Sequence, residues 1–399
     1  MAAPRTTTAL VIPELNGQFE LQEVRLNDIQ PDEVLVEIEA FGICHTDLSC
    51  ATGLLPCRPG AVLGHEGAGK VLSVGSSSTT HLSPGDSVLL SFSHCESCAS
   101  CLSGHPSYCH SFNARNFSGC RPLPVLPDGS VDLTSSSLKD DPFTDPSYAT
   151  FLTPDTNKPI FSQFFGQSSF ARHTLVHTSS CVKVPPETNL ALYAPMGCGM
   201  QTGAGAVLNS LGVKPGSSIA VFGVGSVGMA AVMAAAHIAK AKTIIAIDLQ
   251  ASRLELAQKL GATHAVLGNK SSVEMKKEVR RICPPVGVDY AVDCTGSVAV
   301  IKSMIDVLGT RGRAATVGAP GFGREVGVNV MEHLTYGKEY VGSCEGDSLP
   351  KEFIPFLIEQ HAKGNFPMDQ FVTFYDVKDY KQALEDSHNG KAIKAVLKW

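Results

Sequence analysis

The sequence predicts an α/β protein made of a strand-rich lobe and a doubly wound parallel sheet. Its 399 residues exceed one ordinary hydrophobic core, so two domains are expected. Short, β-rich runs bounded by turn residues fill the amino-terminal part. From residue 218 a buried strand run, a glycine-rich turn and an alanine-rich helix follow one another, and strands then alternate with helices.

Composition narrows the class of protein. The hydrophobic fraction of 43% and charged fraction of 18% are typical of globular domains. A net charge of −6 without a basic block argues against a nucleic-acid partner. The first ten residues lack the apolar core of a signal peptide, and no apolar run reaches the ~20 residues of a membrane span. Thirteen cysteines, an odd number, favour metal-bound and free thiols in a reducing, cytoplasmic compartment.

The amino-terminal strands lead to the first chemically informative stretch. Strands are expected at Thr8–Ile12, Glu20–Val24, Val34–Ala40, Gly64–Val74 and Ser87–Ser91. Directly after the third run come Cys44, His45, Thr46 and Asp47. Thiolate and neutral imidazole are ligands that zinc prefers, and a nearby carboxylate can orient a histidine ligand. A Cys-His pair is more often a buried thiol beside an ordinary histidine, but the later Gly64-His65-Glu66 and Cys198 strengthen the metal interpretation.

Four cysteines within one loop predict a second metal site. Cys95, Cys98, Cys101 and Cys109 can close a tetrahedron around zinc and leave no position for water. Such a site holds a loop in shape and does no chemistry. Four free thiols or an iron–sulfur cluster are the alternatives, although the surrounding lobe has no ferredoxin repeat.

The stretch Asn116–Pro159 is rich in Pro, Ser, Asp and Gly and has little periodicity, which predicts a long surface excursion. A part in lining a substrate entrance and a neutral insertion are both open interpretations. A strand is expected next at Phe170–Val176, and then a helix over Ala191–Val207 that contains Cys198.

The next stretch carries a dinucleotide fingerprint. Gly223, Gly225 and Gly228 follow the strand run Ser218–Phe222 and open a helix, and Asp248 closes a second strand twenty residues past the last glycine. The glycines would let the backbone approach a pyrophosphate, and Asp248 would hold the ribose hydroxyls and repel a 2′-phosphate, which predicts NAD. A tight turn with a solvated Asp248 is the alternative. Further strands are expected at Thr243–Ile247, Tyr290–Cys294, Ala314–Val317, near Tyr340 and at Lys394–Lys398, with helices at Val298–Leu308 and Leu349–Ala362.

Taken together, these residues resemble the zinc-dependent alcohol dehydrogenases of the medium-chain dehydrogenase/reductase superfamily, in particular those acting on aryl and allylic alcohols. The stretch from Gly64 to Gly69 is close to that family's zinc signature, and the four-cysteine loop has its spacing. The resemblance runs from about Ala9 to Trp399 and leaves out Asn116–Pro159. It implies a GroES-like catalytic domain over residues 1–195, a Rossmann NAD-binding domain over 196–343 and a return to the catalytic domain over 344–399.

The resemblance also implies roles for single residues. Cys44, His65 and Cys198 would hold a catalytic zinc, with Glu66 behind the metal as a transient ligand or a structural group. Thr46 would hydrogen-bond the substrate hydroxyl, and Asp47 would orient His65. The residues expected to contact the cofactor are His45, Thr202, Gly223, Gly225, Val227, Gly228, Asp248, Arg253, Val317, Gly318, Ala319 and Lys394. His45, Arg253 and Lys394 could instead be plain surface charges.

The resemblance further implies two zinc ions per chain, NAD and a small alcohol or aldehyde as partner, in a homodimer built through the cofactor domain or a tetramer. The apolar residues expected at the substrate pocket, or else in ordinary core, are Leu48, Leu54, Phe92, Phe164, Phe165 and Ala319, and the rings of the three phenylalanines favour a primary aromatic or allylic alcohol.

Ser49 stands where many relatives carry the histidine that ends a proton relay. A glutathione-dependent formaldehyde-type dehydrogenase and a non-catalytic nucleotide-binding relative are the alternatives.

Overall fold

The chain divides into two compact units. The computed structural model describes residues 5–76, 81–122 and 145–399. The first unit comprises Met1–Cys198, Leu349–Pro355 and Phe371–Trp399, and the second comprises Gly199–Ser348 and Phe356–Gln370. Cys198 therefore groups with the first unit although the expected boundary lay at residue 195. Residues 356–370 group with the second unit although they were expected to return to the first.

The first unit is built on two sheets. One sheet has the strand order β4-β1-β2-β7-β8 among the described residues, with antiparallel pairing throughout. Its strands are β1 (Thr6–Ile12), β2 (Glu20–Leu26), β4 (Ala61–Val62), β7 (Phe151–Leu152) and β8 (Pro159–Ile160). The expected strands at Thr8 and Glu20 are thus confirmed, each with two more residues at one end.

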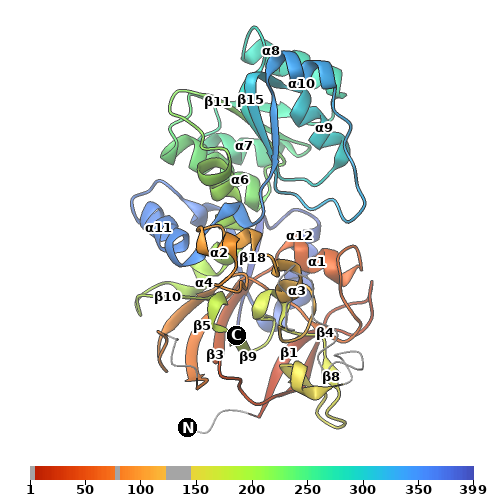
Figure 1. Ribbon diagram of the computed structural model, residues 1–399, viewed down its shortest axis with the longest axis vertical. Coiled ribbons are helices and arrows are strands. Elements are labelled where there is room, and N and C mark those ends of the chain that lie inside the picture. The colour runs from red at the N-terminus through yellow and green to blue at the C-terminus, as the bar shows by residue number, and fades with distance from the viewer. Residues whose placement is uncertain (1–4, 77–80, 123–144) are drawn as a thin grey trace. The chain divides into compact units, whose positions relative to one another are not determined.

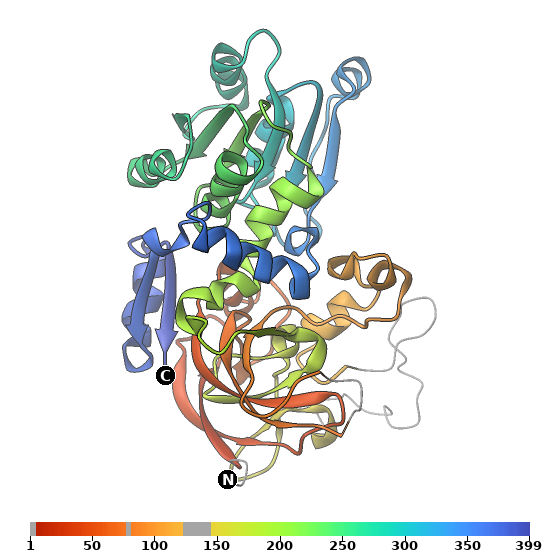
Figure 2. The ribbon, with the colours of Figure 1, turned by 90° about the vertical axis from the view of Figure 1, so that its left-hand side faces the viewer.

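The second sheet of this unit places β3 at its centre. Its order is β10-β6-β5-β3-β18-β17, and β9 also pairs with β3. The strands are β3 (Glu33–Gly42), β5 (Gly67–Val74), β6 (Ser87–Leu90), β9 (His173–His177), β10 (Cys181–Val184), β17 (Val372–Asp376) and β18 (Lys394–Lys398). Because β3 carries almost entirely buried side chains, the register of its neighbours is well specified. Figure 2 shows β17 and β18 side by side with the helix α12 (Tyr380–His388) against them.

Short helices connect these strands. They are α1 (His45–Ala51), α2 (Ala99–Leu102), α3 (Phe112–Asn116) and α4 (Leu190–Tyr193). The surface excursion expected from Asn116 to Pro159 is wrong at its carboxyl end, because β7 and the preceding Thr150 are buried and extend the first sheet. Residues 123–144 of that stretch lie outside the described part of the chain.

The second unit is a parallel sheet of order β13-β12-β11-β14-β15-β16 within the described ranges. This order is that of the doubly wound dinucleotide-binding fold. Its strands are β11 (Ser218–Phe222), β12 (Thr243–Asp248), β13 (His264–Leu267), β14 (Val288–Asp293), β15 (Leu308–Thr316) and β16 (Glu339–Gly342). The fold class expected from the sequence is therefore confirmed.

Helices flank this sheet (Figure 1). They are α5 (Gly199–Gly205), α6 (Ser226–Met233), α7 (Ala251–Lys259), α8 (Ser272–Ile282), α9 (Val298–Asp306) and α10 (Val330–Tyr336). Strand alternation assigns the two faces: Ala220 and Phe222 share a core cluster with residues of α8 and α9. Val221 points the other way, toward Gly228 of α6.

Two helix expectations had different outcomes. The helix α11 (Pro350–Ala362) matches the expected range closely and runs from the first unit into the second. The continuous helix expected over Ala191–Val207 is wrong, because Cys198 has φ −141° and ψ −86° and interrupts it. Pro195 and the flanking glycines allow this break, which separates the short helix η5 (Ala194–Gly197) from α5.

Within the described residues, no helix is long and apolar enough to cross a bilayer.

Candidate active site

Three potential metal ligands from distant parts of the first unit meet at one point. Cys44 ends the link from β3 to α1, His65 lies between β4 and β5, and Cys198 lies at the break after η5. Their ligand atoms all lie within 4.8 Å of one another, and all three residues are buried. Two sulfurs and one ring nitrogen at this spacing suit a zinc ion that keeps a fourth position open.

The Asp47 carboxylate holds two of these ligands in place. One oxygen, Oδ1, accepts hydrogen bonds from His65 Nδ1 at 2.9 Å and from the Gly64 backbone N–H at 3.1 Å. The other, Oδ2, accepts from the Cys44 backbone N–H at 3.0 Å and so forms half of a capping box at the start of α1. This is the orienting role expected of Asp47, and it directs His65 Nε2 toward the two cysteines.

The donor set fits zinc. His65 Nε2 is buried and has no hydrogen-bond partner in the part of the chain that the structure describes. A hydrogen bond with Cys198 holds the pKa of the Cys44 thiol well below its usual value, against the opposing effect of burial. Burial alone would lower the pKa of His65, but the charges of Asp47 and Cys44 raise it well above its usual value. Two thiols and an imidazole oriented by a carboxylate are the donors that zinc prefers.

A buried ion pair lies next to the ligands. Lys394 Nζ donates to both carboxylate oxygens of Glu66, each at 2.9 Å, and to the Ile43 carbonyl at 3.0 Å. Burial alone would lower the pKa of Lys394, but the Glu66 carboxylate raises it. These contacts make Lys394 the buried partner of Glu66, and its expected contact with cofactor phosphate stays a prediction.

Gly42 is required by the same ion pair. A Cβ atom at Gly42 would lie 2.0 Å from Glu66 Oε2. Only glycine therefore leaves room for the carboxylate behind the ligands. The sequence singled out Glu66 but gave no indication of this contact with the end of β3.

The residues around Cys44 differ in exposure. Thr46 is half-buried, and its Oγ1 lies 3.7 Å from Cys44 Sγ, so its hydroxyl is beside the ligand set. His45 is exposed, and Ser49 is buried in the same helix. Leu48 is half-buried against the core, while Leu54 is 48% exposed.

Aromatic rings surround His65. Phe165 stacks on the imidazole with ring centroids 4.6 Å apart, and Phe164 meets it edge-on at 5.4 Å. Phe164, Phe165 and Phe92 are almost completely buried, so they form the base of the cluster. The half-buried rings are Phe117, which lies 5.1 Å from Phe165, and Phe112, which lies 6.3 Å from it.

Sequence reasoning missed Phe112 and Phe117. Both belong to the segment that follows the four-cysteine loop, where no strand or helix period marks a buried face. Asn116, fully buried, fixes this segment by accepting from Ser93 N–H at 2.8 Å and donating to the Ser93 carbonyl at 3.0 Å. Aromatic residues close to a zinc-type cysteine loop were the available signal.

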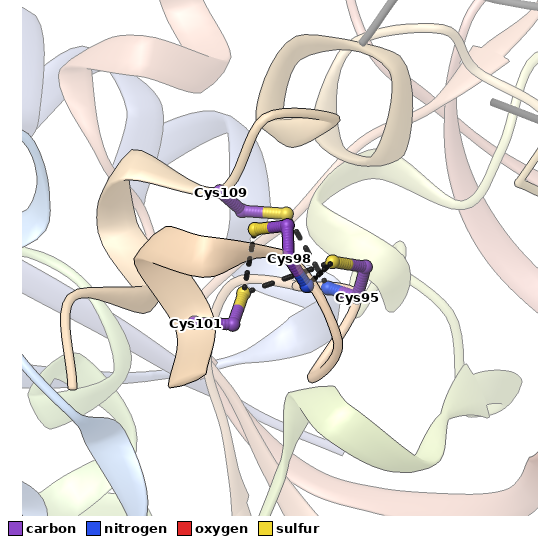
Figure 3. Close-up of side chains that lie close together, drawn as sticks. All are labelled: Cys95, Cys98, Cys101 and Cys109. Atoms are coloured by element: carbon purple, nitrogen blue, oxygen red, sulfur yellow. Dashed lines mark hydrogen bonds between the residues drawn. The ribbon is translucent and has the colours of Figure 1, made fainter. Parts of the chain in front are cut away.

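The four-cysteine loop forms the second ligand set. The sulfurs of Cys95, Cys98, Cys101 and Cys109 all lie within 4.8 Å of one another and turn toward a common centre (Figure 3). The backbone N–H of Cys98 donates to Cys95 Sγ at 3.3 Å, and that of Cys95 donates to Cys109 Sγ at 3.4 Å. Backbone donors of this kind favour thiolates, and despite partial burial they help to lower the pKa of Cys95 to about 5. This arrangement fits a closed structural zinc site.

In the second unit, the glycine-rich turn has the form expected for a dinucleotide site. Gly223 has φ +82°, and a Cβ at Gly228 would lie 2.0 Å from the Gly223 carbonyl oxygen. Gly225 caps α6, so the helix begins directly after the turn. Asp248 accepts from the Val224 backbone N–H at 2.8 Å, which places its carboxylate at the turn.

The other expected cofactor residues lie at the same edge of this sheet or next to it. Val227 is half-buried in the first turn of α6, and Val317, Gly318 and Ala319 directly follow β15. Thr202 is nearly buried in α5. Arg253, on α7, has a buried Nε without a hydrogen-bond partner among the described residues.

Comparison with known proteins identifies the family of this chain. The model of the alcohol dehydrogenase GroES-like domain matches residues 30–132, and that of the zinc-binding dehydrogenases matches residues 226–362. A geraniol dehydrogenase from Castellaniella defragrans is 36% identical over 389 residues, which cover 98% of this chain and 96% of that protein. The chain belongs to the zinc-dependent alcohol dehydrogenases. It is therefore an oxidoreductase, and membership implies zinc and a nicotinamide cofactor.

Two further relatives of this alcohol dehydrogenase bear on its substrate. The crystal structure of benzyl alcohol dehydrogenase from Acinetobacter calcoaceticus superimposes with a TM-score of 0.85 at 38% identity and covers 99% of both chains. An S-(hydroxymethyl)glutathione dehydrogenase from a Synechocystis species is 33% identical over 397 residues, 98% of each chain.

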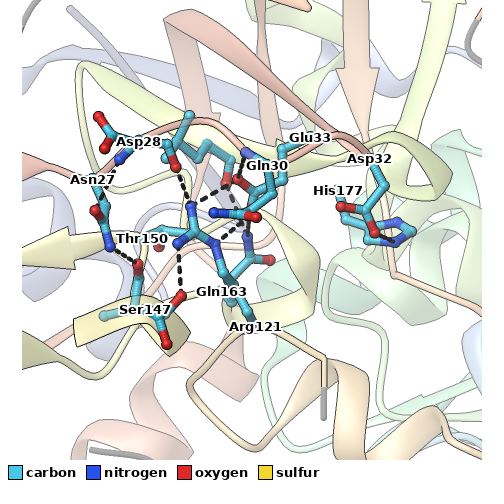
Figure 4. Close-up of polar contacts among 12 residues, drawn as sticks. Asn27, Asp28, Gln30, Asp32, Glu33, Arg121, Ser147, Thr150, Gln163 and His177 are labelled. Atoms are coloured by element: carbon cyan, nitrogen blue, oxygen red, sulfur yellow. Dashed lines mark hydrogen bonds and ion pairs between the residues drawn. The ribbon is translucent and has the colours of Figure 1, made fainter. Parts of the chain in front are cut away.

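A buried ion pair supports the first unit of this alcohol dehydrogenase. Arg121 donates through Nε and Nη2 to the two oxygens of Glu33 at the start of β3, each at 2.8 Å (Figure 4). Its remaining donors reach the carbonyls of Asp28 and Ser147. Arg121 therefore ties the segment after the four-cysteine loop to the central strand, in a stretch where the sequence indicated only surface.

Replacing Arg121 tests this support. We expect Arg121→Met to lower the free energy of unfolding by about 3–5 kcal/mol, because Glu33 would remain buried and ionised without its partner. The measurement is urea unfolding followed by circular dichroism. The matched control is Arg172→Met, whose pair with Glu37 is about one-third exposed and should change the free energy by only about 1 kcal/mol or less. Equal losses in the two variants would contradict this difference.

Proposed function

We propose that this protein reversibly oxidises primary aromatic or allylic alcohols to aldehydes, with NAD as hydride acceptor and with one catalytic and one structural zinc per chain. The observation that carries the proposal is the buried triad of Cys44, His65 and Cys198, with an aromatic ring stacked directly on its histidine. A non-catalytic relative would be expected to lack one of these ligands, and all three are present.

In the proposed reaction, zinc held by Cys44, His65 and Cys198 would polarise the alcohol oxygen and lower its pKa. Thr46 would hydrogen-bond the substrate hydroxyl, and its Oγ1 would accept the substrate proton as the Thr46 hydroxyl passes its own proton onward. Asp47 keeps His65 in the tautomer that presents Nε2 to the metal, and Glu66 with Lys394 supplies a neutral ion pair behind it. Because Ser49 cannot act as a terminal base, the proton leaves through water or through another histidine.

Zinc content and the two cysteine sets give the first test of this function. We expect elemental analysis to find two zinc ions per wild-type chain and one in each of Cys44→Ser and Cys98→Ser. Cys44→Ser should abolish turnover with little change in melting temperature, because its site forms within an already folded unit. Cys98→Ser should lower the melting temperature, because the closed site contributes to folding. One zinc in wild type, or identical behaviour of the two variants, would reject this division of roles.

Cofactor choice rests on Asp248. Its carboxylate lies at the glycine-rich turn, where it can accept from ribose hydroxyls and repel a 2′-phosphate. Arg253 on α7 carries the opposite charge, and we propose that it packs beside the adenosine ribose. His45, Thr202, Val227 and the segment from Val317 to Ala319 are proposed as further contacts of the cofactor.

We therefore predict that the protein prefers NAD+ over NADP+. Asp248→Asn should weaken this preference by about tenfold or more, because it removes the negative charge that repels the 2′-phosphate. The measurement is the ratio of kcat/KM for the two cofactors. Asp289→Asn is the matched control, because Asp289 also accepts from a backbone N–H but lies at the opposite end of the sheet. Equal efficiency of wild type with both cofactors would show that Asp248 does not select.

Substrate class rests on the rings around His65. Phe112 and Phe117 are the half-buried members of the cluster, so we propose that they, above the base formed by Phe92, Phe164 and Phe165, meet the substrate. Aromatic pairs contribute ~0.5–1.5 kcal/mol beyond area burial, so two contacts give roughly tenfold discrimination. The named activities of the geraniol and benzyl alcohol dehydrogenases support an allylic or aromatic alcohol.

The third prediction is that cinnamyl and benzyl alcohol exceed ethanol in kcat/KM with NAD+. Phe117→Leu should reduce the preference for benzyl alcohol over ethanol by about fivefold through loss of one ring contact. Phe374→Leu, at a ring 42% exposed on β17, serves as the control and should leave the ranking unchanged. A preference for ethanol in wild type would refute the aromatic pocket while leaving the zinc assignment intact.

A glutathione adduct is the second candidate substrate, because the Synechocystis relative is named for one. Including hydroxymethylglutathione in the same panel distinguishes the two classes. Higher efficiency with that adduct than with benzyl alcohol would favour the thiol-dependent reaction.

We also propose a cytoplasmic homodimer built through the second unit. None of the thirteen cysteines forms a disulfide, which supports a reducing compartment. Val330, Met331 and Leu334 on α10 are 72%, 63% and 73% exposed, and an apolar patch of this kind is typical of a protein interface. Light scattering of the purified protein measures the oligomeric state.

A further inference from the structure

A turn with unusual backbone conformation follows the last strand of the parallel sheet. Glu345, Gly346 and Asp347 have φ values of +48°, +69° and +48°, so three consecutive residues are left-handed. Two of them are not glycine, and such residues are costly unless the surroundings fix them. They form the short helix η8 (Glu345–Asp347) of the second unit.

Close contacts hold this turn against α5. A Cβ at Gly205 would lie 2.2 Å from the Gly346 carbonyl oxygen, and a Cβ at Gly346 would lie 2.4 Å from that of Gln201. Asn209 Nδ2 donates to the carbonyls of Gly346 and Asp347 at 3.1 and 3.2 Å. The turn is therefore fixed, and so is the direction of the Glu345 side chain.

The Glu345 carboxylate reaches the first turn of α5. Its Oε2 accepts from Thr202 Oγ1 at 3.3 Å and from Gln201 Nε2 at 3.4 Å. The next residue, Gly203, packs so closely that an added Cβ would lie 2.0 Å from the carbonyl oxygen of Val227 in α6. The carboxylate thus lies beside α5, which itself packs against α6, the helix that follows the glycine-rich turn.

The sheet register places Glu345 at the edge where a dinucleotide binds. Phe222 of β11 pairs with Asp293, Asp293 with Thr316, and Thr316 with Gly342 of β16. These residues end or nearly end parallel strands at one edge, and Glu345 follows Gly342 by three residues. In doubly wound sheets, ligands bind outside the carboxyl ends of the strands.

We propose that Glu345 is a charge partner of the nicotinamide ring that favours NAD+ over NADH. The inference rests on the proposed function, in which Thr202 is a contact of the cofactor, and it assigns this contact to the nicotinamide end. The ring is cationic in NAD+ and neutral in NADH, so a fixed carboxylate next to its contact residue stabilises the oxidised form alone. By linkage, tighter binding of NAD+ relative to NADH favours loading with NAD+ and release of NADH, and it makes the bound cofactor harder to reduce.

Equilibrium binding of the two cofactors, without substrate, tests the inference. Dissociation constants for NAD+ and NADH are measured by calorimetry on the purified full-length protein. Glu345→Gln keeps the size of the side chain and its hydrogen-bonding oxygen but removes the charge. We expect it to weaken NAD+ binding by roughly fivefold while NADH binding stays unchanged.

Asp347→Asn is the matched control, because it removes the same charge from the same left-handed turn and keeps the contact of Glu345 with Thr202, so it should leave both constants unchanged. Thermal unfolding of both variants reports on the turn itself. Equal weakening of NAD+ and NADH by Glu345→Gln, or an unchanged ratio, would overturn the charge role and leave Glu345 as a structural group. Failure of wild type to bind either cofactor would instead overturn the proposed function.

Discussion

The active site depends on one carboxylate. Asp47 accepts hydrogen bonds from the imidazole of His65 and from the backbones of Gly64 and Cys44, so it joins two ligand-bearing segments that come from different strand connections. Without it, the ring of His65 could rotate and the first turn of α1 would lose its capping box. The same carboxylate therefore orients a proposed metal ligand and stabilises the start of α1.

The charge of the site is balanced by the buried pair of Glu66 and Lys394. Taking two charges out of water rarely stabilises a protein, so their presence is better explained by their position. The Lys394 ammonium contributes to the low pKa of Cys44, and the Glu66 carboxylate keeps that ammonium charged. Because Lys394 begins β18, which pairs with β3, the end of the chain takes part in the electrostatics of a site that begins at Cys44.

Features that depend on neighbouring residues in the chain were predicted from the sequence, and features that depend on contacts between distant residues were not. The strand Ser218–Phe222, its glycine-rich turn and Asp248 were predicted closely, because neighbouring residues determine them. The helix break at Cys198 was missed, because helix propensity does not report contacts with distant strands. At the preceding residue, Gly197, an added Cβ would lie 1.9 Å from the carbonyl oxygen of Leu90 in β6, so no side chain fits there. The contact of Lys394 with Glu66 was not predicted, because a sequence records a charge but not the direction in which a side chain points.

The two ligand sets differ in what they require of the fold. Cys95, Cys98, Cys101 and Cys109 lie in one loop, so the entropic cost of bringing them together is small and a metal can help to shape the loop itself. Cys44, His65 and Cys198 are distant in the chain and meet only when both β3 and the segment after η5 are in place. The folded protein holds these three ligands in place without needing a fourth. The fourth coordination position of the metal can therefore stay free for water or substrate. The local set is suited to building structure, and the distributed set is suited to chemistry.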